Sequence, residues 1–314
     1  MFKCIGAGAA ALMLLCLGGC ASGGGGGTTT PTPPPPPPPG FTSWNNVHAP
    51  ATVTVSGISQ DTEFTRTYPN SDMSGYIFKD PGPISNGSFT ESINATGDVT
   101  SAEIKSPNHT VSFGNVPPSN TNPAYLYVGG MPLDTALAAN PYELGWNYQS
   151  FGVWQTGWLD DTNRSAGAMS VGADTPPSAV PTTGTATFTG QAGGLLFDGY
   201  GRGRAIAASL NVAVDFAARS ATLSSGTMAS ADDFSGNFSG FNLNGALSYA
   251  AGKNTLTGTL RTGNGLLSGS ATARFYGPAA QEFGGVFTLT GPQVNGGSET
   301  PVRFIGGFGA VRSH

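Results

Sequence analysis

Few side chains in this sequence combine in a way that would support acid–base or nucleophilic catalysis. Of its three histidines, His48 follows a Pro-rich segment and His314 is the last residue. His109 remains, within the Pro/Asn-rich segment 106–109. A Ser-His-Asp relay needs an imidazole held in position by its neighbours, whereas a histidine in such a segment is typical of a solvated loop. We therefore predict no catalytic residue and interpret His109 as a loop side chain.

The cysteines lie at one end of the chain. All three, Cys4, Cys16 and Cys20, fall within the first twenty residues. The remainder of the sequence therefore has no disulfide, no thiolate nucleophile and no Cys-based zinc site.

The acidic residues do not form a site of known type either. Two acidic pairs, at 160–161 and 232–233, lie in polar stretches, and a calcium loop needs about six oxygen ligands at defined spacing. Glu282 would need a second carboxylate nearby to act as a catalytic acid, so we interpret it as a structural carboxylate held by backbone donors. The sequence predicts no metal, no cofactor and no enzymatic activity.

The amino-acid composition excludes several fold classes. The 314 residues include 48 Gly and 24 Pro, and only 10% are charged. Helical proteins of this size carry about 25% charged residues and less glycine, which argues against a helix bundle or a doubly wound α/β fold. The net charge of -5, with 13 basic residues spread thinly, argues against a nucleic-acid partner.

The first forty residues are typical of a targeting signal followed by a linker. Lys3 precedes an apolar run at 5–15, which is too short to cross a bilayer and suits a signal peptide. The sequence LGGC at 17–20 resembles a bacterial lipobox. The resemblance implies cleavage after residue 19 and acylation of Cys20, anchoring the chain to the outer membrane. A plain secretory signal is the alternative.

A low-complexity segment follows the signal. Residues 20–40 are rich in Gly, Thr and Pro, which cannot bury enough apolar surface to fold. A flexible glycine run followed by a polyproline rod suits display to a large partner. It is equally suited to crossing a lipopolysaccharide layer without recognising anything.

From residue 51 onward the sequence reads as strands. The clearest example is the segment 205–215, where Ile206, Leu210, Val212 and Val214 alternate with smaller or polar residues. Eight such segments follow residue 184, which is enough to close a barrel; a β-sandwich of similar length is the alternative. The eight are 185–189, 204–214, 220–228, 236–248, 255–262, 267–275, 282–290 and 302–310. We expect one helical turn at 277–282, where Pro278 follows a glycine.

Four ordered motifs carry a resemblance to a known family. The sequences FYGPAAQEFGGVF at 275–287, IGGFGA at 305–310, GTATFTG at 184–190 and VDF at 214–216 resemble the barrels of transferrin-binding protein B. A weaker similarity covers 125–154. The resemblance implies an all-β fold with an N-terminal handle-like β domain, 41–178, and a C-terminal eight-stranded antiparallel β-barrel, 179–314. Only one such lobe is present.

The resemblance also implies a function. The family that the sequence resembles includes iron-acquisition receptors and small solute-binding lipoproteins. Many of these proteins reach the cell surface through a Slam-type translocon. We expect an outer-membrane lipoprotein facing outside that binds a host or environmental protein or a metal- or haem-bearing ligand, with a TonB-dependent receptor as a further partner. The alternatives are an envelope-maintenance lipoprotein and a carrier of haem, siderophore or metal in the barrel.

Two segments offer candidate ligand-binding side chains. Aromatic residues crowd into 142–158, and exposed Trp and Tyr are favoured interface anchors, although the same residues suit a strand core. A Gly-rich segment at 199–204 carries two arginines. The candidates are Tyr142, Trp146, Tyr148, Trp158, Tyr200, Arg202 and Arg204.

Overall fold

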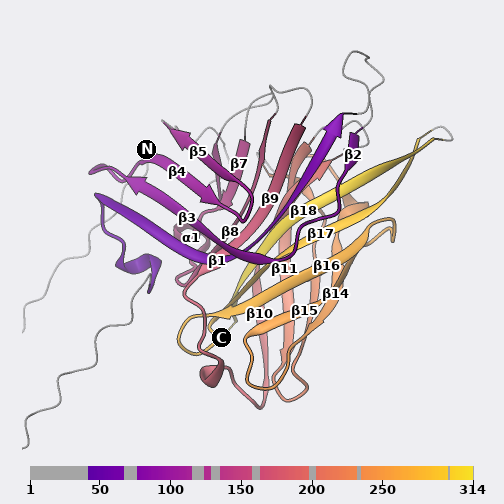
Figure 1. Cartoon of the computed structure of the whole chain (residues 1–314). Helices are drawn as coiled ribbons and strands as arrows, with labels where there is room; N and C mark the ends of the chain where they lie inside the picture. Colours follow the sequence, from indigo (N-terminus) through magenta and orange to yellow (C-terminus); the bar gives the residue numbers. More distant parts are fainter. Residues whose placement is uncertain are drawn as a thin grey trace, which may run out of the picture.

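Two antiparallel sheets make up this computed structural model, which is all-β as predicted (Figure 1). The structure describes residues 42–66, 76–114, 124–128, 135–157, 163–197, 203–231, 235–295 and 298–313. None of the helices in these ranges has the length and apolar character needed to span a bilayer.

The first sheet, here called the handle sheet, is a curled half-barrel with the strand order β5-β4-β3-β1-β9-β8-β7-β6, and β2 pairs with β1. A short 3-10 helix, Trp44–Asn46, and the helix α1, Pro141–Leu144, lie beside it. Its strands are β1 Ala51–Arg66, β2 Tyr76–Phe78, β3 Ser85–Ile93, β4 Val99–Lys105, β5 Thr110–Gly114, β6 Tyr125–Val128, β7 Thr135–Ala139, β8 Gln149–Thr156 and β9 Asn163–Gly172.

The second sheet closes on itself as an eight-stranded barrel, in the order β10-β18-β17-β16-β15-β14-β12-β11. Pairing of β10 with β11 seals the cylinder, and β13 adds to β11. Closure confirms the barrel and excludes the sandwich. The strands are β10 Thr185–Phe197, β11 Gly203–Asp215, β12 Ser220–Ser225, β13 Ala229–Ser230, β14 Leu243–Ser248, β15 Thr255–Thr262, β16 Ser268–Tyr276, β17 Glu282–Asn295 and β18 Ser298–Arg312.

Large aromatic side chains pack inside the barrel. Phe283 lies at the centre of this group, with ring centroids 5.4 Å from Phe275, 5.9 Å from Phe308 and 6.0 Å from Phe188. All four rings are fully buried. Side chains therefore fill this part of the barrel, as expected for a cylinder of eight strands.

Three local expectations from the sequence need correction. Strand β10 extends well beyond 185–189, because its second half is buried on both faces and shows no alternation. Strand β14 starts at Leu243 rather than 236, after a 3-10 helix at Ser239–Phe241. The prediction of a helical turn at 277–282 is wrong. Residues 277–280 form a turn in which Gly277 and Ala280 have φ of 84° and 56°, values that a right-handed helix does not accommodate.

Candidate functional site

The handle sheet and the barrel are joined by a buried carboxylate. Glu282, at the start of β17, is 1% exposed. Its Oε1 accepts a hydrogen bond from the backbone N–H of Asn147 (2.6 Å), and its Oε2 accepts from Tyr148 (3.0 Å) and Gln149 (2.9 Å). We call this arrangement the Glu282 clamp. Burial raises the pKa of Glu282 to about 7, although the three N–H donors act in the opposite direction.

Further polar bonds cross the same interface. Thr288 donates to Gln60 Oε1 (3.0 Å), and the hydroxyls of Tyr276 and Ser170 lie 2.8 Å apart. Arg303 of β18 donates from Nη1 to Thr62 Oγ1 (2.6 Å). These hydrogen bonds hold the handle sheet in a fixed position against the barrel.

Glycines of β18 provide the flat surface on which the handle rests. A Cβ at Gly307 would stand 2.8 Å from the ring of Phe151, and one at Gly309 would stand 2.3 Å from Gln149 Nε2. Ile305, on the same strand, belongs to a buried apolar cluster shared with Phe151. Gly307 and Gly309 of the 305–310 motif are therefore required by close approach between the two sheets.

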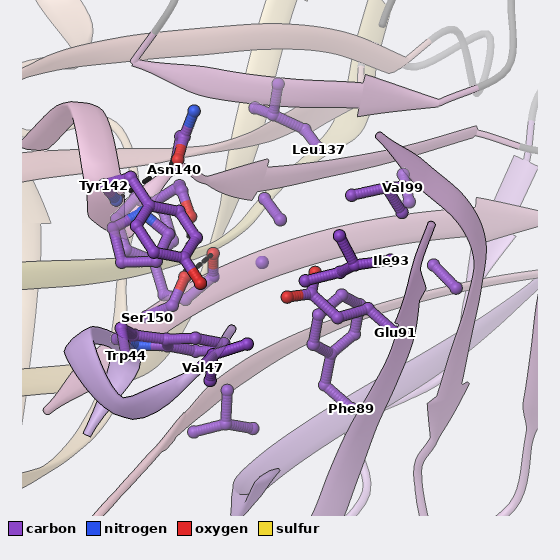
Figure 2. Close-up of a pocket in the computed structure, with 18 of the residues that line it drawn as sticks. Trp44, Val47, Phe89, Glu91, Ile93, Val99, Leu137, Asn140, Tyr142 and Ser150 are labelled. Atoms are coloured by element: carbon purple, nitrogen blue, oxygen red, sulfur yellow. Dashed lines mark hydrogen bonds between the residues drawn. The ribbon is translucent and has the colours of Figure 1, made fainter. Parts of the chain in front are cut away.

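The face of the handle sheet away from this interface carries an apolar pocket of about 330 Å³ (Figure 2). Trp44 comes from the 3-10 helix, Phe89 and Glu91 from β3, and Ser150 from β8. Tyr142 of α1 forms part of the rim, 50% exposed, with its ring centroid 6.3 Å from that of Trp44.

Glu91 is the buried charged group of this pocket. Its side chain points from β3 into the space between the sheet and α1 (Figure 2). The residue is only 4% exposed, and burial raises its pKa to about 7. Among the described residues no hydrogen bond or ion pair reaches its carboxyl group.

A second polar group on this sheet overturns the interpretation of His109 as a solvated loop side chain. Its Nδ1 lies 3.0 Å from Asp61 Oδ2, its Nε2 lies 2.8 Å from Ser165 Oγ, and its ring packs on Trp154 at 5.3 Å. Ser106 and Asn108 also donate to Asp61. Burial of Asp61 acts to raise its pKa, but these hydrogen bonds together lower it below the ordinary value.

The order of atoms in this group is that of a Ser-His-carboxylate relay, but its surroundings favour a structural role. Ser165 lies inside β9, paired with Glu63 of β1 on one side and Thr156 of β8 on the other. Backbone N–H groups here serve the sheet, whereas acyl transfer needs N–H donors aimed at an oxyanion. The group fastens the β4–β5 loop to the sheet.

Comparison with known proteins identifies the barrel. Residues 180–312 match the family model described as the C-lobe and N-lobe β-barrels of transferrin-binding protein B. These residues therefore form a transferrin-binding protein B-like barrel domain. No curated protein matches the sequence.

Solved structures of transferrin-binding protein B are similar at low identity. The isotype 1 protein from serogroup B Neisseria meningitidis is 16% identical, with a TM-score of 0.44 over 82% of this chain. A variant from Haemophilus parasuis is 13% identical, with a TM-score of 0.40 over 84% of this chain and 77% of its own. The chain spans only 44% of the length of the meningococcal protein.

The predicted binding residues of this chain occupy different environments. Tyr142 lies at the pocket rim, and Arg204 is exposed at the start of β11. Trp146 is 3% exposed and packs against Phe151 at 6.0 Å, while Tyr148 is half-buried beside the clamp. The other predicted residues, Trp158, Tyr200, Arg202 and the lipidation site Cys20, lie outside the described residues.

The pocket was missed at the sequence level, although a signal for it was present. Phe89, Glu91 and Ile93 share one face of β3 because they are two residues apart. A carboxylate between two apolar residues on one strand face indicates either that the face is exposed or that the acid is buried. The structure shows the second, because Glu91 is the buried residue of β3. Trp44 had no signal, because its partners lie about a hundred residues later.

Proposed function

We propose that this chain is an outer-membrane lipoprotein, displayed on the cell surface, which binds a host or environmental protein or a metal- or haem-bearing ligand without catalysing a reaction. The match of residues 180–312 to transferrin-binding protein B barrels carries the proposal, because that family consists of binding proteins. Lipidation at Cys20 would hold the chain at the membrane, and residues 20–40 would serve as the tether. The handle domain, 41–178, and the barrel domain, 179–314, would together form the binding module.

Partners follow from the same proposal. A Slam-type translocon would deliver the chain to the surface, and a TonB-dependent receptor would take over a captured nutrient such as iron. The fixed relation of handle and barrel supports a binding role, because a rigid scaffold presents loops in a constant geometry. Among the candidate contacts that the structure describes, Tyr142 at the pocket rim and Arg204 at the start of β11 are exposed, Tyr148 is half-buried and Trp146 is buried.

Protease treatment of intact producing cells tests surface display. We expect added protease to remove the folded domains, and a Cys20→Ser variant to be released from the membrane fraction. A chain that is fully protected in intact cells, yet cleaved after the outer membrane is opened, would contradict surface display. That result would favour an envelope-maintenance lipoprotein facing the periplasm.

Affinity capture tests binding. The chain immobilised through its C-terminus is exposed to serum and to culture fluid, beside the variants Tyr142→Ala and Leu266→Ala. Both side chains are exposed, at 50% and 51%, but Leu266 lies in a turn of the barrel away from the pocket. We expect a captured protein to be lost with Tyr142→Ala and retained with Leu266→Ala. Equal capture by both variants would exclude Tyr142 from the contact.

A further inference from the structure

The charged side chains that line the handle pocket all have the same sign. Glu91, Asp98 and Glu143 contribute carboxylates, and among the described residues no Lys, Arg or His lines the space. Asp98 and Glu143 lie at exposed positions, whereas Glu91 is buried. The pocket therefore presents negative potential to whatever enters it.

Glu91 is the decisive group because it is buried and has no partner. It is 96% buried, with 4% exposure, and no described side chain or backbone group donates to it or pairs with it. Its carboxyl group is aimed into the pocket between Trp44, Phe89 and Ile93 (Figure 2). Buried polar groups in folded proteins are almost always hydrogen-bonded, and an isolated buried charge is costly. The carboxyl group of Glu91 faces the pocket, so its partner is whatever fills that space, either solvent or a donor group of a ligand.

The rest of the pocket determines what kind of partner fits. Its walls are mostly apolar, with Trp44, Phe89, Ile104 and Phe113 among them, and its volume of about 330 Å³ falls within the range of small-molecule sites, roughly 300–1,000 Å³. A divalent cation would need several oxygen ligands, and no group of three metal-ligating side chains occurs among the described residues. An anion would meet three carboxylates. A neutral apolar molecule would leave Glu91 without a partner.

We propose that the handle pocket binds a small lipophilic amine, whose protonated amino group pairs with Glu91 and whose apolar body packs against Trp44 and Phe89. The inference goes beyond the proposed function and depends neither on the lipid anchor nor on a protein partner. A buried carboxylate paired with an ammonium group forms a charge-assisted hydrogen bond, which is roughly twice as strong as a neutral one.

Proton linkage gives this pairing a characteristic pH dependence. Burial raises the pKa of Glu91 to about 7, whereas a primary alkylamine stays protonated up to about pH 10. Below pH 7 the amine must displace a proton from Glu91, and above pH 7 it meets a carboxylate. Affinity for an amine should therefore increase from pH 6 to pH 8, and affinity for an alcohol of the same skeleton should not.

The test uses three probes with one apolar skeleton: 4-phenylbutylamine, 4-phenylbutan-1-ol and 4-phenylbutyric acid. Each is titrated by calorimetry at pH 8 into the full chain carrying Cys20→Ser, so that no attached acyl chain competes for the pocket. We expect the amine to bind at least tenfold more tightly than the alcohol, and the acid to bind most weakly. Tighter binding of the acid, or no binding of any probe, would overturn the proposal.

Two variants locate the effect. Glu91→Gln should reduce amine affinity at least tenfold and leave alcohol affinity unchanged. Glu103→Gln is the matched control, because Glu103 lies on the neighbouring strand β4 and alternates to the opposite face from Ala102 and Ile104, which line the pocket. Unchanged amine affinity in Glu91→Gln would refute the role of Glu91. If that variant unfolds, the increase in amine affinity of the unsubstituted protein between pH 6 and pH 8 decides the question alone, and a flat profile refutes it.

Discussion

Replacing Glu282 by alanine should loosen the whole lobe, because one side chain holds three backbone groups of another sheet. Glu282 accepts from the N–H groups of Asn147, Tyr148 and Gln149 at 2.6, 3.0 and 2.9 Å. A buried donor left without a partner costs about 1–3 kcal/mol. Because water entering the vacated space would satisfy some of the three, we expect a loss of about 3–5 kcal/mol rather than the full sum.

Thermal unfolding at pH 8, where Glu282 is ionised, followed by circular dichroism, measures this loss. For domains of 150–250 residues, 1 kcal/mol corresponds to about 2–4 °C in Tm, so Glu282→Ala should lower Tm by about 6–20 °C. The Tm of Glu282→Gln should lie between those of the unsubstituted protein and Glu282→Ala. The amide oxygen of Gln still accepts a hydrogen bond, whereas its NH₂ group faces a backbone donor. Glu143→Ala is the control, since Glu143 is exposed on α1. A shift for Glu282→Ala no larger than that of the control would refute the clamp.

Three further predictions concern the two buried glutamates, Gly307 and Asp61. Burial raises the pKa of Glu91 and of Glu282 from 4.5 to about 7, so the folded state binds more protons between these values and stability should fall as pH rises from 4.5 to 7. At 1.36 kcal/mol per pKa unit the loss is at most about 3 kcal/mol for each group, and urea titrations should show a flatter pH profile in either Gln variant. Gly307→Ala places a Cβ 2.8 Å from the Phe151 ring; we expect about 1–3 kcal/mol of destabilisation and faster proteolysis of the handle than of the barrel, and unchanged proteolysis would count against close docking. Asp61 has a lowered pKa, so its stabilising effect is present at neutral pH and lost as pH falls through that pKa; Asp61→Asn should cost about 1–3 kcal/mol at pH 7, with the difference from the unsubstituted protein narrowing in acid.

The barrel could be predicted from the sequence because its strands alternate. Leu210, Val212 and Val214 of β11 face the core, and the residues between them face outward, so period two marks the strand directly. The second half of β10 gave no such signal. One of its faces is covered by the handle and the other by the barrel core, so both faces select small or apolar residues.

The candidate site was harder to predict, because its groups meet across long sequence separations. Glu282 was expected to be held by backbone donors, but the donors belong to residues 133 to 135 positions earlier in the chain, in a different sheet. His109 was read as a solvated side chain because its partners, Asp61 and Ser165, are 48 and 56 residues away. No local pattern encodes such contacts, which depend on how β1, β9 and the β4–β5 loop come together.

Strand β8 shows how the handle sheet serves two purposes with one sequence. The side chains of Gln149 and Phe151 meet the glycines of β18, whereas Ser150, which lies between them, lines the pocket. Because successive side chains of a strand point to opposite faces, a change in the pocket acts on the same backbone that the Glu282 clamp holds. The clamp bonds the backbone at Gln149, immediately before Ser150. One wall of the handle pocket therefore lies on the strand that the clamp holds, which favours a preorganised binding site, since less ordering remains to be done there when a ligand enters.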